Sequence, residues 1–147
     1  MTPEEKKQIV AFNHKLAQVV DIRLTTSDDA RSQGLEIFGR KLTENASKVR
    51  VHTEKNPVAG SMPGLHIASS LVYHAIPHGT ELPPFLDMLA EVSEQNAKTS
   101  TAGPCRENEF PAKLKLYVSS TCTFCPAVVK NLCSLVLQNP HIKLMII

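Results

Sequence analysis

The chain has 147 residues, enough for one ordinary domain or two small ones, and its hydrophobic content of 42% excludes wholesale disorder. Sixteen basic side chains against 14 acidic ones leave a net charge of +2, too balanced for a protein that binds nucleic acid through its phosphates. No apolar run reaches the length of a membrane span, and the first residues lack the apolar stretch of a secretory signal. We therefore expect a soluble, cytoplasmic protein.

The first 95 residues predict a complete small α/β unit. Residues 2–5 (Thr-Pro-Glu-Glu) combine an N-cap, a proline at the first helical position and a capping-box glutamate, so a helix is expected over 3–19. Ser27, followed by two aspartates, caps a second helix. Alternating or short apolar runs predict four strands, over 22–25, 49–52, 65–68 and 71–75. A last helix over 81–95 completes a βαββα unit behind the leading helix.

The remainder of the chain repeats part of this pattern. Residues 96–112 are polar, without periodicity, and predict a linker. A strand over 113–118, a helix over 125–138 and a strand over 142–147 follow, in the order of the strand–helix–strand at 22–52. We therefore expect a complete repeat in 1–95 and a second, C-terminally truncated βαβ repeat in 113–147.

The chemistry of the sequence is concentrated in the second repeat. Cys122 and Cys125 are separated by two residues and lie where a strand runs into a helix. The unpaired N–H groups and the dipole of a helix N-terminus favour a thiolate, and thiolates are the species that attack disulfides. Cys125 follows one helical turn later, on the same face. We expect Cys122 to be the nucleophile and Cys125 to be the resolving cysteine.

A zinc site is the main alternative for these cysteines. Its other ligands would be Cys105 and Cys133, but those spacings match no usual zinc knuckle. Cys133 is better interpreted as a small core residue, and Cys105 as an exposed linker thiol. The six histidines are scattered without metal-ligand spacing, and those on strands are expected to face solvent or to be hydrogen-bonded. Neither a metal nor a bound cofactor is expected.

The cysteine motif carries a family resemblance. Residues 119–126 (Ser-Ser-Thr-Cys-Thr-Phe-Cys-Pro) resemble a thioredoxin-fold redox motif. The longer stretch 116–129, with 139–143 and 77–82 (Pro-His-Gly-Thr-Glu-Leu), is similar to the N-terminal tandem thioredoxin-fold domain of the flavoprotein component of bacterial alkyl hydroperoxide reductase (AhpF). Protein disulfide oxidoreductases and glutaredoxin-like proteins are related to it. The resemblance covers nearly the whole chain, and only the cysteine segment is specific by itself.

The resemblance implies a division of labour between the two repeats. One thioredoxin fold carries the working dithiol, and the other has Asp28 and Arg31 in place of the two cysteines. In the family, the dithiol passes electrons from a flavin-linked dithiol to a peroxiredoxin. This chain departs from the pattern in two ways: it has no Gly-x-Gly-x-x-Gly nucleotide motif, and its second repeat lacks the last two strands, the last helix and the proline loop. Pro63 would be the matching proline of the first repeat, with the cis or trans form of its bond left open.

The expected function is that of a thiol–disulfide oxidoreductase or electron-transfer module. Its partners would be a peroxiredoxin-like or other disulfide protein and a flavin dithiol reductase. We expect it to bind neither nucleic acid nor a membrane. The alternative is a truncated, non-catalytic docking domain of the thioredoxin-like fold. The strand over 113–118 would have a neighbour on one side only. Two arrangements would cover its open side: the first sheet extends to pair with it, or two chains associate through it. We expect association, or marginal order of residues 113–147 as a unit that moves on the linker.

Overall fold

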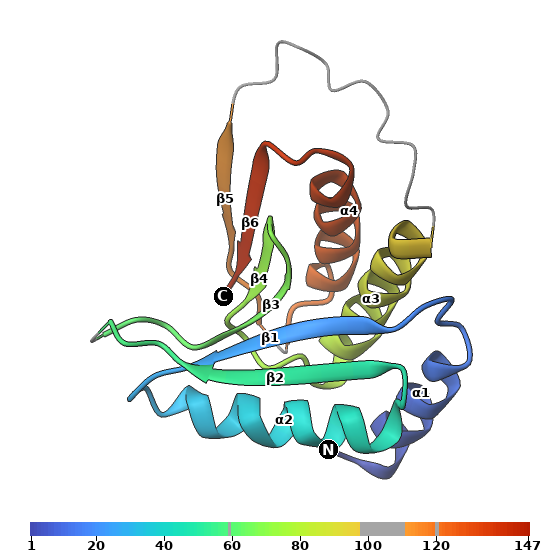
Figure 1. Ribbon diagram of the computed structural model, residues 1–147. Coiled ribbons are helices and arrows are strands. Elements are labelled where there is room, and N and C mark those ends of the chain that lie inside the picture. The colour runs from blue at the N-terminus through green and yellow to red at the C-terminus, as the bar shows by residue number, and fades with distance from the viewer. Residues whose placement is uncertain (59, 98–110, 120) are drawn as a thin grey trace.

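The computed structural model describes residues 1–58, 60–97, 111–119 and 121–147. The described residues form a mixed α/β fold with six strands in one sheet, in the order β2-β1-β3-β4-β6-β5 (Figure 1). In chain order the elements are α1 (Pro3–Asn13), β1 (Val20–Thr26), α2 (Arg31–Asn45), β2 (Val49–Lys55), β3 (Gly64–Ala68), β4 (Leu71–Tyr73), the 3-10 helix η1 (Gly79–Glu81), α3 (Leu82–Ala97), β5 (Ala112–Leu116), α4 (Cys125–Gln138) and β6 (Ile142–Ile146).

The sheet consists of two parallel strand pairs on either side of a hairpin. β1 is parallel to β2, and β5 is parallel to β6. Between them lies the antiparallel pair β3 and β4, with β3 antiparallel to β1 as well. The two halves meet where β4 pairs in parallel with β6, with Leu71 opposite Leu144. The sheet therefore continues from the first half of the chain into the second.

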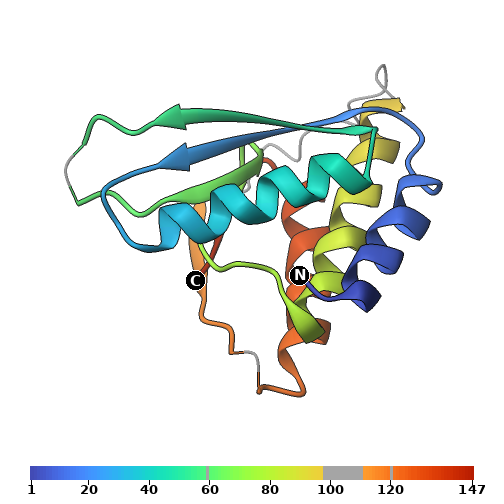
Figure 2. The ribbon, with the colours of Figure 1, turned by 90° about the horizontal axis from the view of Figure 1, so that it is seen from below.

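The four described α-helices lie on one side of this sheet, with α1 packed on α2 and α3 (Figure 2). The register of the paired strands sorts their side chains into rows that point alternately to the two faces of the sheet. One row is buried beneath the helices and comprises Leu24, Leu65, Tyr73, Ile146 and the partly buried Leu116. The neighbouring row points to the other face and comprises His52, Arg23, His66, Val72, Met145 and Lys115. This alternation gives a sheet with one covered face and one face open to solvent.

One hydrophobic core spans both halves of the chain. Its centre holds three rings in edge-to-face contact, with Phe38 and Tyr73 each packed against Phe85 at centroid distances of 5.5 and 5.2 Å. Val129, Val136 and other buried residues of the second half belong to the same cluster, and α4 packs on α3. The expectation that 113–147 moves as a separate unit is therefore wrong, because this unit has no core of its own.

The leading helix is shorter than its sequence pattern predicted. α1 ends at Asn13 instead of continuing to residue 19, although Leu16 remains buried. Side chains from elsewhere bind this backbone: the Ser93 hydroxyl accepts from the Gln18 N–H at 2.7 Å and donates to the Gln18 carbonyl at 2.8 Å. The Asn13 side chain also accepts from the Lys48 N–H at 3.0 Å. These tertiary hydrogen bonds replace those of a further helical turn.

The connections between elements differ in part from those expected. None of the described peptide bonds is cis, so the bond before Pro63 is trans. The first half of the sheet reaches the second half through β6 and not through β5, so the alternative in which the first sheet extends to pair with the strand at 113–118 is wrong. Most of the predicted linker, residues 98–110 with Cys105, lies outside the described residues. The division into two repeats stays a prediction. None of the described helices combines the length and apolar character needed to cross a membrane.

Candidate dithiol site

The structure brings Cys122 and Cys125 together at the start of α4. The chain leaves β5, turns at Ser119, whose carbonyl accepts from the Cys122 N–H at 3.0 Å, and enters the helix at Cys125. Cys122 therefore lies before the helix, and the predicted helix over 125–138 is confirmed. Its sulfur accepts a hydrogen bond from the Cys125 backbone N–H at 3.1 Å. Pro126 occupies one of the first two helical positions, where no intrahelical donor is needed.

The two thiols differ in exposure and in acidity. Both are free, with Cys122 partly exposed and Cys125 buried. A hydrogen bond from the Cys125 thiol lowers the pKa of Cys122, and the backbone N–H groups of Phe124 and Cys125 lower it further. The same thiol–thiol hydrogen bond raises the pKa of Cys125. The arrangement favours a thiolate at the accessible Cys122 sulfur and a protonated thiol at Cys125.

A buried carboxyl from the first half of the chain lies near this pair. Glu81, at the end of η1, is 4% exposed, and neither of its oxygens has a hydrogen-bond partner among the described residues. Burial raises the pKa of this carboxyl above its ordinary value. In its charged form it raises the pKa of both Cys122 and Cys125. The site therefore includes a buried acid whose charge acts on both thiols.

Sequence reasoning missed Glu81. It stands at the first position of the helix expected over 81–95, where an acidic residue usually complements the helix dipole. The packing of η1 and α3 against α4 gives it a different environment. The sequence contains only a weak sign that this acid is buried: Glu81 directly precedes Leu82, where a strongly apolar helix face begins.

Two buried groups of the core also have raised pKa values. Tyr73 on β4 is fully buried, and its hydroxyl has no hydrogen-bond partner in the described part of the chain. Burial, with smaller contributions from Cys133 and Glu81, raises the pKa of this hydroxyl far above its ordinary value. Cys133 is 1% exposed, and burial raises its pKa to about 12, so it behaves as the core residue that was predicted.

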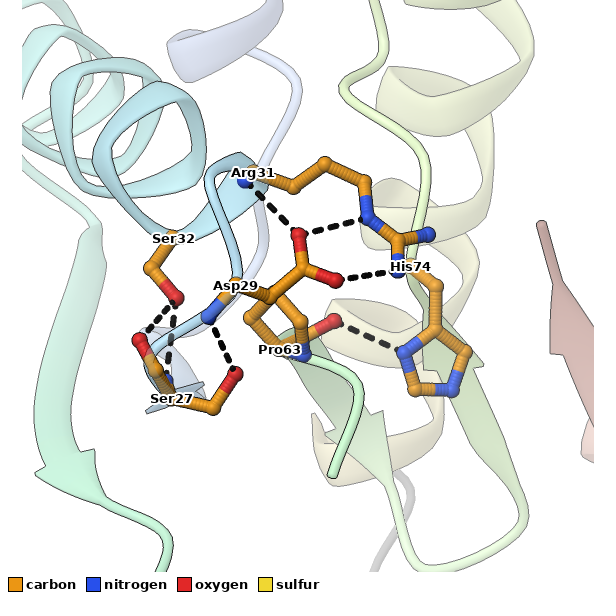
Figure 3. A network of polar contacts seen from close by, with 6 residues as sticks. All are labelled: Ser27, Asp29, Arg31, Ser32, Pro63 and His74. Atoms are coloured by element: carbon orange, nitrogen blue, oxygen red, sulfur yellow. Dashed lines mark hydrogen bonds and ion pairs between the residues drawn. The ribbon is translucent and has the colours of Figure 1, made fainter. Parts of the chain in front are cut away.

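The corresponding turn of the first half, between β1 and α2, holds ion pairs in place of thiols (Figure 3). The Asp29 carboxylate accepts from Arg31 Nε at 2.9 Å and Nη2 at 2.6 Å, and from the Arg31 backbone N–H at 2.9 Å. These hydrogen bonds lower the pKa of Asp29 to about 2. Ser32 closes the turn by accepting from the Ser27 N–H and donating to its carbonyl. Asp28 is instead paired with Lys55 at 3.2 Å, so Asp28 and Arg31 do not pair with each other.

Pro63 lies directly before β3. Its carbonyl lies 2.7 Å from Nδ1 of the buried His74 (Figure 3). Histidines 52, 66 and 78 likewise have polar partners in Asp21, Thr25 and Glu5. Among the described residues, no group of three or more histidines, cysteines or acids has a geometry that could hold a metal ion. Ser27, Asp29, Arg31 and Ser32 of the first-half turn bind through one another's backbone and side chains, and the turn holds no thiol.

No family model matches the chain, and no curated protein matches it in sequence. Solved structures do match, and they show the fold to be thioredoxin-like.

Two of these structures are of the alkylhydroperoxide reductase component AhpF from Enterococcus faecalis. A mutant of AhpF matches with a TM-score of 0.76 at 20% identity, covering 100% of this chain and 79% of that chain. The N-terminal domain of AhpF matches with a TM-score of 0.77 at 20% identity, covering 99% and 79%. A protein disulfide oxidoreductase from Aeropyrum pernix matches with a TM-score of 0.72 at 10% identity, covering 98% and 74%. The predicted resemblance is therefore confirmed at the level of the fold.

Proposed function

We propose that the protein is a thiol–disulfide oxidoreductase that transfers two electrons through Cys122 and Cys125. The observation that carries this proposal is the 3.1 Å hydrogen bond from the Cys125 N–H to the Cys122 sulfur, in a pair whose accessible member has the lowered pKa. A structural pair of core cysteines would be equally buried, and neither thiol would have its pKa lowered. The dithiol–disulfide couple itself is the redox group, and no other cofactor is required.

The reaction proceeds in two exchanges. The Cys122 thiolate attacks one sulfur of a partner disulfide, that S–S bond breaks, and the second partner sulfur leaves as a thiolate and takes up a proton. The Cys125 thiol then loses its proton and attacks the Cys122 sulfur. This step forms the Cys122–Cys125 disulfide and releases the partner as a dithiol. Two electrons pass from the protein to the partner, and the reverse sequence restores the dithiol from a donor.

Glu81 is the group proposed to accept the proton of Cys125. A buried thiol with a raised pKa attacks slowly unless a base removes its proton. Glu81 is a carboxyl without a competing hydrogen bond among the described residues, and burial raises its pKa, which makes it a stronger base than an exposed carboxylate. The negative charge of Glu81 disfavours a thiolate at Cys125. When the carboxylate takes up the Cys125 proton, that charge is lost, so protonation of Glu81 favours the attack that forms the new disulfide. Glu81 thus acts on the second exchange.

The proposed acceptor is a peroxiredoxin-like or other disulfide protein, and the proposed donor is a flavin-linked dithiol. This part of the proposal rests on the fold shared with AhpF and with a protein disulfide oxidoreductase. We place the reaction in the cytoplasm, where free thiols persist. A non-catalytic docking role is the second candidate. It is favoured by the first-half turn, which presents the exposed Asp28 and Arg31 and no thiol.

Replacement of each cysteine tests the proposal. Cys122→Ser should abolish reduction of a protein disulfide, whereas Cys125→Ser should accumulate a mixed disulfide with the substrate, detected as an adduct by mass spectrometry. Cys133→Ser is the matched control, since Cys133 is buried in the core and should leave the reaction unchanged. Equal behaviour of Cys122→Ser and Cys125→Ser, with no adduct from either, would refute the assignment. Slow alkylation of Cys122 at low pH would favour the docking role.

A further inference from the structure

The carboxylate of Glu5 on α1 joins two segments that lie far apart in the sequence. Its Oε2 accepts from the Thr2 N–H at 2.6 Å and so closes the capping box of α1, which needs only this contact of the carboxylate. Its Oε1 accepts from the Gly79 N–H at 2.9 Å and lies 3.3 Å from Nδ1 of His78. The second oxygen therefore binds residues 73 and 74 positions further along the chain, where η1 begins.

Burial makes these contacts strong. Glu5 is 8% exposed, and the helix that carries it packs on α2 and α3 (Figure 2). Hydrogen bonds to a charged group strengthen where water is excluded. The neighbouring Glu4 shows the contrast, because it pairs with Lys7 at the surface and its side chain is 71% exposed. Glu5 therefore holds the start of η1 more firmly than a surface carboxylate would.

The residues that bind Glu5 also form the turn that carries Glu81. The Glu81 N–H donates to the His78 carbonyl at 3.1 Å, and the Leu82 N–H donates to the Gly79 carbonyl. The His78 ring is fixed on its own account, since it meets the Phe38 ring edge to face at a centroid distance of 5.6 Å. A hydrogen-bonded path of two steps thus runs from the Glu5 carboxylate to the backbone of Glu81.

Glu81 needs such support. It is buried, and neither of its oxygens has a hydrogen-bond partner among the described residues. A buried carboxyl of this kind gains free energy when it reaches water, so it stays in place only if its backbone is held. η1 also packs against α4, which begins at Cys125. A loosened η1 would therefore change where the carboxyl stands relative to the dithiol helix.

We propose that Glu5 is a positioning residue for the dithiol reaction: by binding His78 and Gly79 it fixes η1, and thereby keeps the Glu81 carboxyl in its buried place as the acceptor of the Cys125 proton. Glu5 acts through Glu81 and not on the thiols themselves. This inference rests on the proposed function, in which Glu81 assists the second exchange.

Glu5→Gln tests the inference on the full chain, because glutamine keeps the shape of the side chain and removes its charge. We expect release of the substrate from the mixed disulfide, measured by stopped-flow under single-turnover conditions, to slow at least about threefold. The pKa of Cys122, followed by the ultraviolet absorbance of its thiolate, should fall, since the charge of Glu81 raises it in the wild type. Glu4→Gln is the matched control. It makes the same change at the adjacent exposed position and should leave both quantities unchanged.

The double variant E5Q/E81Q separates positioning from a general loss of stability. Adding E5Q to E81Q should alter neither the release rate nor the pKa of Cys122 any further, although the melting temperature still falls. Gly79→Ala disturbs the contact from the other side and serves if E5Q does not fold. The backbone there has φ +59°, and an added β-carbon would meet no atom within 4 Å, so alanine strains the turn without a clash. Its effects should likewise vanish in the E81Q background.

Two results would overturn the inference alone. One is equal slowing by E5Q with and without the Glu81 carboxyl. The other is wild-type release and an unchanged pKa of Cys122 in E5Q, while E81Q is slow. Wild-type release in E81Q would overturn the proposed proton transfer, and this inference with it.

Discussion

Replacement of Glu81 should raise the free energy of unfolding and slow the release of substrate from the mixed disulfide. The carboxyl is 4% exposed with both oxygens unpaired among the described residues, and a buried polar group without a partner costs about 1–3 kcal/mol. Glu81→Leu removes that cost, so the free energy of unfolding should rise by about 1–3 kcal/mol. For a chain of this size the melting temperature should rise by roughly 2–4 °C per kcal/mol. Glu81→Gln keeps a buried polar group, so it should gain much less.

The pH dependence of stability provides an independent check. Because the pKa of Glu81 is raised in the folded state, the native protein retains a proton that the unfolded chain has already lost. Stability should therefore fall as the pH rises from the ordinary carboxyl pKa of 4.5 through the raised value. Urea unfolding across this range should show the decline in the wild type, and both Glu81 variants should lack this contribution.

The same substitutions should slow the second exchange. With the proton acceptor removed, release of the substrate from the mixed disulfide should slow by at least about tenfold in both variants, measured by stopped-flow under single-turnover conditions. The pKa of Cys122 should fall, since the negative charge of Glu81 raises it in the wild type. A Glu81→Leu variant that is no more stable than the wild type would refute the burial argument. An unchanged release rate in both variants would refute the proton-transfer role.

Three further predictions concern the scaffold. The pKa of Glu5 is lowered to about 2. Burial acts to raise this pKa, but hydrogen bonds from the backbone N–H groups of Gly79 and Thr2 outweigh the effect of burial. The ionised Glu5 should contribute on the order of 2 kcal/mol to the free energy of unfolding, fully above pH 4.5 and progressively less as the pH falls towards 2. Urea unfolding of Glu5→Gln should therefore depend less on acid than that of the wild type. Ser93→Ala leaves the Gln18 backbone without its partner and should cost about 1–3 kcal/mol in thermal unfolding, whereas an unchanged melting temperature would show that water replaces the hydroxyl. The double substitution of Asp28 and Arg31 by alanine should leave disulfide reduction within about twofold, and a loss as large as that of the nucleophile variant would show the first-half turn to be catalytic.

The parts that sequence predicted well are those with local causes. The capping box before α1 forms as expected, with Thr2 and Glu5 exchanging hydrogen bonds, because all its groups lie within four residues. The strand, turn and helix around Cys122 depend on local patterning and on Pro126 in the first turn of α4, which is why the two thiols meet as expected.

What the sequence determined by itself was the set of elements, their buried faces and the position of the dithiol. Only the tertiary structure decided that α1 ends at Asn13, that β4 pairs with β6, and that the buried Glu81 acts on the two thiols through its charge. Periodicity shows that one face of an element must be buried, but any apolar surface of similar size satisfies that requirement. The choice of partner comes from the simultaneous packing of α3, α4 and the sheet, and the environment of Glu81 follows from that choice.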